Sequence, residues 1–118
     1  MKIVLCDDHQ ILAEELGQLI KKFDEKNQLQ NEFLYFSKPS LLFEYMEANV
    51  VDLIFMDLEF HDSSEDGILW LKKIKKSFPR TVVIILTAFE NRYKEGFEAR
   101  VFRFMTKPID ENELFEYL

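Results

Sequence analysis

Five polar side chains that could take part in chemistry lie at the ends of separate apolar runs. Asp7 and Asp8 follow the run 2–6, Asp57 follows 52–56, Thr87 follows 82–86 and Lys107 follows 101–106. Two carboxylates ~4 Å apart repel each other by about 4 kcal/mol at an effective dielectric near 20. Three carboxylates in one place would therefore need a raised pKa or a bound cation. Their hard oxygen donors suit Mg²⁺, which keeps several waters for an incoming phosphate.

The same residue types are suited to phosphoryl transfer. Asp57 is the candidate nucleophile, because a carboxylate can attack a phosphoryl group to give an aspartyl phosphate. Such transfer depends mainly on positioning and charge stabilisation, which a metal, the Lys107 ammonium and the Thr87 hydroxyl would supply. Ala88 is small and would leave the approach to Asp57 open. For the Asp7–Asp8 pair alone, a position at a helix N-terminus is the competing interpretation.

The elements that must position these residues alternate along the chain. The apolar runs, with residues 32–36, have the length and composition of buried strands. Apolar spacing predicts a helix over 10–23 and a second helix that begins after a Ser37 N-cap and Pro39. It predicts a third helix from 68 to 78 and a weak fourth helix over 90–100. Residues 109–112 are predicted to open a short last helix. This pattern predicts an α/β fold with a doubly wound parallel sheet, whose strand order it does not fix. All strand ends would meet at one edge, so the polar residues would share a crevice.

Composition limits the class of protein. The 118 residues fit one domain, and 47% apolar residues, including 12 Phe, predict a packed core. A net charge of −7 disfavours direct binding to nucleic acid or anionic lipid. The single Cys6 is predicted to be a buried structural thiol in a reducing compartment. Without an apolar stretch long enough for a membrane span or room for a signal peptide, we expect no membrane association and a cytoplasmic location.

Four motifs together resemble the receiver domain of bacterial two-component response regulators. They are Cys6-Asp7-Asp8-His9, Phe55-Met56-Asp57-Leu58, Leu86-Thr87-Ala88 and Phe104-Met105-Thr106-Lys107-Pro108. The resemblance covers residues 1–118. It implies a flavodoxin-like fold with strand order 2-1-3-4-5, and a switch phosphorylated by a sensor histidine kinase. It implies no enzyme activity beyond catalysis of the switch's own phosphorylation and dephosphorylation.

The resemblance also implies roles for individual residues. Asp57 would accept the phosphoryl group and also bind a Mg²⁺ ion. Asp8 would bind this ion directly and Asp7 mainly through water. The backbone carbonyl of Glu59 would be a further ligand. Lys107 would contact the phosphoryl group, with a cis bond to Pro108. Thr87 would move toward the phosphate and Phe104 would follow it inward. The signal would pass through the fourth helix, fifth strand and fifth helix to an output domain.

Residues 97–108 further resemble regulators whose output is a LytTR-type DNA-binding domain. That domain is absent from residues 1–118, and the short last helix is interpreted as truncated. DNA binding in transcription regulation would then occur only through the absent domain. Aromatic residues Tyr93, Phe97 and Phe104 are candidates for a face that forms a homodimer on phosphorylation.

Some features depart from the family pattern or allow other interpretations. The loop 59–66 is acidic and lacks a Pro before Gly67, which could alter phosphate access or lifetime. We expect His61 to be exposed, and His9 to cap or pack rather than bind a metal. A pseudo-receiver that only binds proteins is an alternative, although no member of the site is missing. A phosphatase resembling the haloacid dehalogenase superfamily fits less well, because Glu59 stands where its second Asp would be.

Overall fold

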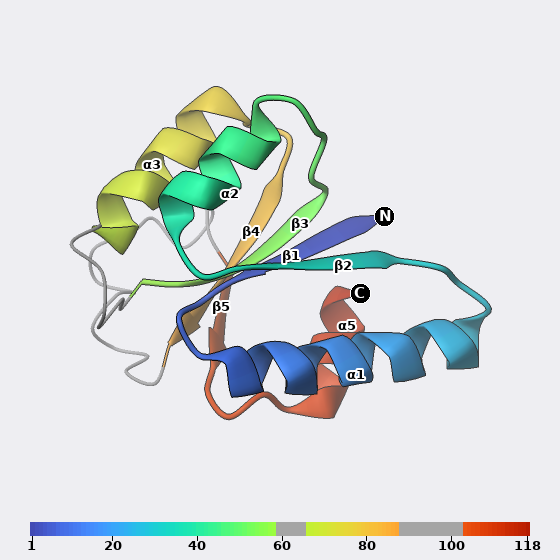
Figure 1. Ribbon diagram of the computed structural model, residues 1–118. Coiled ribbons are helices and arrows are strands. Elements are labelled where there is room, and N and C mark those ends of the chain that lie inside the picture. Colours follow the sequence, from blue (N-terminus) through green and yellow to red (C-terminus); the bar gives the residue numbers. More distant parts are fainter. Residues whose placement is uncertain (59–65, 88–102) are drawn as a thin grey trace.

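The computed structural model of the chain describes residues 1–58, 66–87 and 103–118. Strands and helices alternate along it, apart from the ranges that are not described (Figure 1). The strands are β1 (Lys2–Cys6), β2 (Glu32–Phe36), β3 (Leu53–Asp57), β4 (Val82–Thr87) and β5 (Arg103–Thr106). The helices are α1 (Gln10–Asn27), α2 (Pro39–Met46), α3 (Gly67–Ser77) and α5 (Glu111–Tyr117).

All neighbouring strands in the sheet are parallel, and their order is β2-β1-β3-β4-β5. The chain leaves β1 for β2 on one side and later returns to β3 on the other side of β1. This reversal makes the carboxyl ends of β1 and β3 a topological switch point, where open α/β sheets form their ligand crevice. The predicted fold class and strand order are confirmed.

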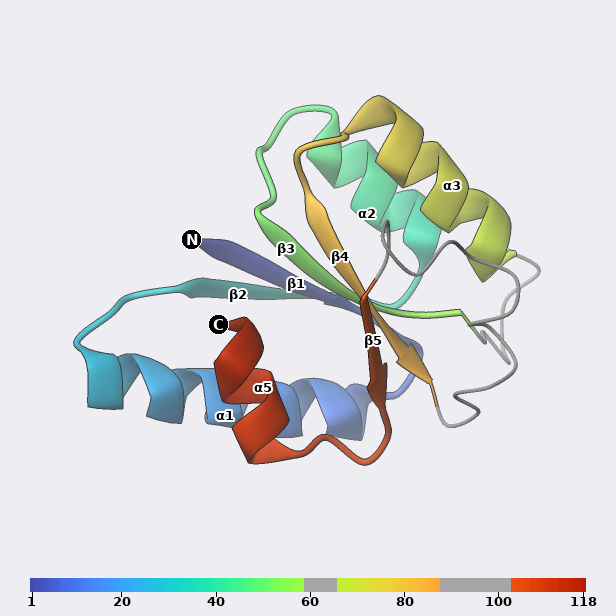
Figure 2. The same cartoon turned by 180° about the vertical axis from the view of Figure 1, so that it is seen from behind.

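Helices cover both faces of the sheet, as Figures 1 and 2 show from opposite sides. Successive strand residues point to opposite faces. Val4 and Cys6 of β1 therefore belong to a cluster with residues of α2 and α3, whereas Ile3 and Leu5 belong to a cluster with residues of α1 and α5. The central strand β3 is buried at every position. Burial on both faces explains why this strand reads as a continuous apolar run.

The structure corrects several predicted helix ends. Helix α1 continues to Asn27, four residues beyond the predicted end, and stops where Gln28 adopts a left-handed conformation at φ 55°. The predicted Ser37 N-cap of α2 is wrong, because Lys38 occupies that position and makes no side-chain capping bond. Helix α3 begins at Gly67, and the Asp66 carboxylate caps it by accepting from the Ile68 and Leu69 amides.

Some predictions lie outside the described residues. These are the weak helix over 90–100, the acidic loop apart from Asp66, the proposed partner residues Tyr93 and Phe97, and the first two residues of the predicted fifth strand. Phe104 is described; it is half-buried and packs against the cluster beneath α2 and α3.

Candidate functional site

Strand register brings three of the predicted site residues together at the carboxyl edge of the sheet. Cys6 pairs with Met56 in the ladder between β1 and β3, so Asp7 follows β1 beside the end of β3, where Asp57 lies. Lys107 directly follows β5 and reaches back to both carboxylates. Its Nζ atom donates to Asp7 Oδ2 at 2.9 Å and to Asp57 Oδ2 at 3.2 Å. The Lys107–Pro108 peptide bond is cis, as predicted.

These ionic groups are largely shielded from water. Asp7 is fully buried, Asp57 is 4% exposed, and the Lys107 side chain is 22% exposed. Burial alone lowers the pKa of the Lys107 ammonium. The hydrogen bond that Lys107 donates to Asp7, the charge of Asp57 and the charge of Asp7 outweigh this effect of burial, so the pKa of Lys107 is raised above its usual 10.5. Lys107 is therefore a charged partner of two buried carboxylates at neutral pH.

His9 is a member of this cluster that the sequence analysis did not assign to the site. It occupies the N-cap position of α1, yet its side chain makes no capping bond. Its Nδ1 atom instead lies 2.8 Å from Asp7 Oδ1 and 3.0 Å from Asp8 Oδ1. The hydrogen bond with Asp7 raises the pKa of the imidazole, against a smaller opposing effect of burial. His9 thus stands at the N-cap, one of the two roles expected for it, but its side chain contacts the two carboxylates instead of capping the helix.

The cluster fits a divalent cation. One donor atom each from Asp7, Asp8, His9 and Asp57 can be chosen so that all four lie within 4.8 Å of one another. Three of these donors are carboxylate oxygens, which suit Mg²⁺. They converge from the ends of β1 and β3, as the spacing of the motifs predicted. Asp7, Asp8 and Asp57 are the described residues that would hold such an ion, and it would neutralise charge that Lys107 and His9 compensate only in part.

Two predicted site members lie wholly or partly outside the described residues. Glu59, the proposed carbonyl ligand, is not described. Thr87 ends β4 and pairs in register with Thr106, one residue before Lys107, but its side chain is not described. Its backbone position agrees with the predicted edge, and its contact with a phosphoryl group stays a prediction. Ala88 and His61 also lie outside the described ranges.

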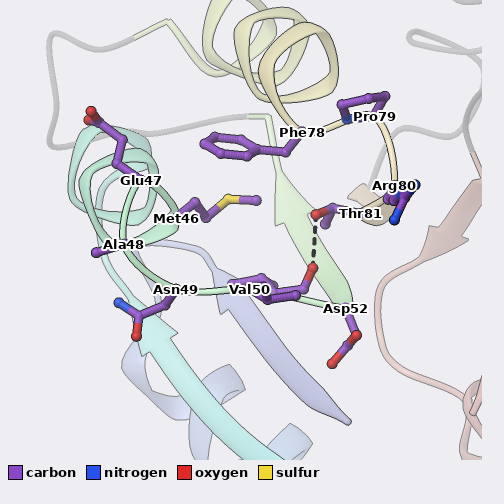
Figure 3. Close-up of a pocket in the computed structure, with 11 residues that line it drawn as sticks. Met46, Glu47, Ala48, Asn49, Val50, Asp52, Phe78, Pro79, Arg80 and Thr81 are labelled. Carbon is purple, nitrogen blue, oxygen red and sulfur yellow. Dashed lines mark hydrogen bonds between the residues drawn. The ribbon is translucent and has the colours of Figure 1, made fainter.

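A pocket is present at the opposite end of the sheet, between the end of α2 and the connection from α3 to β4 (Figure 3). Asp52 and Thr81 are among the residues that line it, and they stand just before β3 and β4 begin. The Thr81 hydroxyl donates to the Val51 carbonyl oxygen at 2.8 Å, which ties the two connections together. This pocket is remote from Asp57, which ends β3 at the other edge, and it contributes nothing to the carboxylate site.

Within the described ranges, we find no helix with the length and apolar character needed to cross a membrane. The parallel 2-1-3-4-5 sheet defines a flavodoxin-like α/β domain, with Asp and Lys groups at its carboxyl edge. Residues 3–118 match the response regulator receiver domain family, and the chain belongs to this family. The family prediction made from the four sequence motifs is confirmed.

Individual relatives support this assignment. The sensory transduction protein LytT of Bacillus subtilis is 24% identical over 118 residues, which are 100% of this chain and 46% of LytT. The chain thus spans less than half the length of this relative, whose name agrees with the predicted LytTR-type subfamily. The crystal structure of the response regulatory domain of MrkE from Klebsiella pneumoniae is similar with a TM-score of 0.79 and 26% identity, covering 98% of this chain and 90% of that one.

A second solved structure shares the fold at lower identity. The response regulator TrrA of Thermotoga maritima, solved in complex with Mg²⁺ and BeF, has a TM-score of 0.80 and 19% identity. The similarity covers 98% of this chain and 94% of that chain.

Proposed function

We propose that the chain is a Mg²⁺-dependent phosphoacceptor switch and that Asp57 receives the phosphoryl group from a sensor histidine kinase. The observation that carries this proposal is the convergence of Asp7, Asp57 and Lys107, with Lys107 Nζ 2.9 and 3.2 Å from the two carboxylates. A buried carboxylate beside a fixed ammonium and further carboxylates is what acyl phosphate chemistry requires.

The transfer can be followed at the level of atoms. One Asp57 oxygen forms a bond to phosphorus while the bond between phosphorus and the histidine nitrogen of the donor breaks. The departing nitrogen keeps the electron pair and takes a proton from solvent. Lys107 faces the charge that develops on the phosphoryl oxygens, and a bound Mg²⁺ would supply further electrostatic stabilisation there. Thr87 would donate its hydroxyl to the phosphoryl group. The chain catalyses its own phosphorylation and dephosphorylation only.

Asp7, Asp8, Asp57 and the Glu59 carbonyl would hold the Mg²⁺ ion. TrrA, whose solved structure shares this fold, is a complex with Mg²⁺ and BeF, which supports Mg²⁺ as the ion. The donor atoms of the three carboxylates are already within 4.8 Å of one another, so binding needs little rearrangement.

We further propose that phosphorylation acts through the fourth helix, β5 and α5 on an output domain outside residues 1–118. The greater length of LytT supports such a domain, and DNA binding in transcription regulation would belong to it. Phosphorylation would also promote a homodimer. A cytoplasmic location is supported by the buried thiol of Cys6, because reducing compartments keep such thiols out of disulfides.

The test is intact mass spectrometry after incubation with acetyl phosphate, with and without Mg²⁺. We expect a Mg²⁺-dependent gain of one phosphoryl group that is absent from Asp57→Asn. Asp52→Asn is the matched control, because Asp52 directly precedes β3, at the end opposite to Asp57, and an Asn oxygen can still accept from the Lys2 amide. No gain with acetyl phosphate or with a phosphorylated cognate kinase would overturn the proposal in favour of a pseudo-receiver.

A further inference from the structure

The imidazole of His9 faces the same space as the carboxylates of the proposed metal site. Nδ1 is 2.8 Å from Asp7 Oδ1 and 3.0 Å from Asp8 Oδ1. Asp7 Oδ1 also accepts a hydrogen bond from the His9 backbone amide at 2.9 Å, which holds the carboxylate beside the ring. The other carboxylate oxygen of Asp7, Oδ2, accepts a hydrogen bond from Lys107. The nitrogen therefore lies on the side of Asp7 that faces Asp8, away from Lys107.

We propose that His9 Nδ1 is a further metal ligand, which makes this a mixed nitrogen and oxygen site with enhanced affinity for first-row transition ions. The inference rests on the metal site of the proposed function and adds a residue to it. Carboxylate and water ligands suit Mg²⁺, whereas imidazole favours ions such as Ni²⁺ and Co²⁺. His9 would therefore determine how strongly the site discriminates between Mg²⁺ and those ions.

The distances between donor atoms are compatible with shared coordination. In an octahedral site with metal–ligand distances of 2.0–2.1 Å, neighbouring donors are about 2.9 Å apart and opposite donors about 4.2 Å apart. The two separations of Nδ1 from carboxylate oxygens, 2.8 and 3.0 Å, match the neighbouring positions. The four chosen donors, all within 4.8 Å, need only a small contraction to enclose an ion.

The position of the ring on the helix agrees with this role. The His9 backbone is extended at φ −104° and ψ 102°, and the side chain is not used to cap α1. The ring is 54% exposed, so the hydrophobic core does not determine its orientation. Its contacts with the two carboxylates hold the ring nitrogen beside the proposed metal site. When Nδ1 carries no proton, its lone pair could bind a metal ion in place of the hydrogen bond that it makes with Asp7 Oδ1 in the metal-free protein.

The test combines nitrogen detection with affinity measurements on the whole chain. Pulsed electron paramagnetic resonance of bound Mn²⁺ should show coupling to a directly bound ¹⁴N nucleus, and His9→Ala should abolish it. In calorimetric titrations, His9→Ala should weaken Ni²⁺ binding at least about tenfold and change Mg²⁺ binding less than about twofold. His9→Gln repeats the test with a longer polar side chain, and circular dichroism checks that each variant is folded.

The other histidine of the chain, His61, provides the control. His61→Ala should keep both the nitrogen coupling and the Ni²⁺ affinity. Mn²⁺ binding without nitrogen coupling, or coupling that persists in His9→Ala and His9→Gln, would overturn the role of His9 and leave the carboxylate site intact. If neither Mn²⁺ nor Mg²⁺ binds to the wild-type protein, the metal site of the proposed function itself is wrong, and this inference falls with it.

Discussion

The Lys107 ammonium lies between two buried carboxylates, 2.9 Å from Asp7 Oδ2 and 3.2 Å from Asp57 Oδ2. Lys107→Met keeps the aliphatic stem and removes the charge, so both carboxylates lose a hydrogen-bonded cation. We expect the free energy of unfolding of the metal-free protein to fall by about 1.5–3 kcal/mol at pH 7, the range for hydrogen bonds to charged groups. Urea denaturation of the two proteins measures the difference.

The pH dependence of this effect follows from the raised pKa of Lys107. A cation whose pKa is raised in the folded state contributes fully below its unfolded pKa, here 10.5, and the contribution is lost as pH rises through the folded value. The difference between wild type and Lys107→Met should therefore stay constant from pH 7 to 9. Lys22→Met is the control, because its bridge to Glu111 is exposed and worth less than about 1 kcal/mol. Equal losses in the two variants would contradict the prediction.

Most of the site could be predicted at the level of single residues because parallel strands fix where their last residues lie. Asp7, Asp57 and Lys107 each follow an apolar run, and register alone places them at one edge. The contact of His9 could not be predicted in this way. Its ring direction depends on side-chain rotation after the strand has ended, which no apolar pattern records. The contact of Thr87 and the carbonyl of Glu59 with a ligand stay predictions.

At the scale of elements, the start of α3 is packed against Leu58, the residue that follows the proposed phosphoacceptor Asp57. A Cβ atom added at Gly67 would lie 2.7 Å from the Leu58 carbonyl oxygen and 2.9 Å from its Cα. Because these are backbone atoms, the helix or the strand end would have to move. We expect Gly67→Ala to lower the free energy of unfolding by about 1–3 kcal/mol, the usual cost of overpacking, and to slow phosphorylation of Asp57 by acetyl phosphate.

Gly17→Ala is the matched control for this variant. Its added Cβ would meet the Phe33 ring at 3.3 Å, and a side chain can shift by a few tenths of an ångström. Alanine also has the higher helix propensity, by about 1 kcal/mol. We expect little net change in stability and an unchanged phosphorylation rate. Wild-type phosphorylation kinetics in Gly67→Ala would show that the close approach to Leu58 does not position Asp57.

The presence of each described helix could be predicted from apolar spacing. The positions of the helix ends depend on polar contacts that this spacing does not reveal. The apolar period of α1 stops at Phe23, but the helix continues because Asp24 organises its end. The carboxylate of Asp24 accepts from the Asn31 backbone amide at 2.8 Å and from its side-chain amide at 2.6 Å. At α3, Asp66 was assigned to the loop although it caps the helix. Asp24 and Asp66 are of one residue type but organise different helix ends, and only their hydrogen-bond partners distinguish these roles.

At the scale of the whole molecule, the sheet joins two separate clusters of buried side chains, and the ionic site lies where the strands between them end. The chain carries a net charge of −7, so a cation at this edge reduces repulsion within an already acidic protein. Ligand binding at the ends of β1 and β3 is thereby linked to the stability of the strands that hold both clusters together.

This linkage gives a prediction for thermal unfolding. An ion that binds only the folded state stabilises it by about 1.4 kcal/mol at ten times its dissociation constant, which corresponds to a rise of about 6 °C in midpoint for a domain of this size. We expect the midpoint to rise with Mg²⁺ concentration in wild type and in Asp52→Asn, and to lose most of this response in Asp8→Asn. Sodium chloride at matched ionic strength separates binding from screening, because screening acts on all three proteins alike. An equal response of Asp8→Asn to Mg²⁺ would show that the Asp8 carboxylate does not bind the ion.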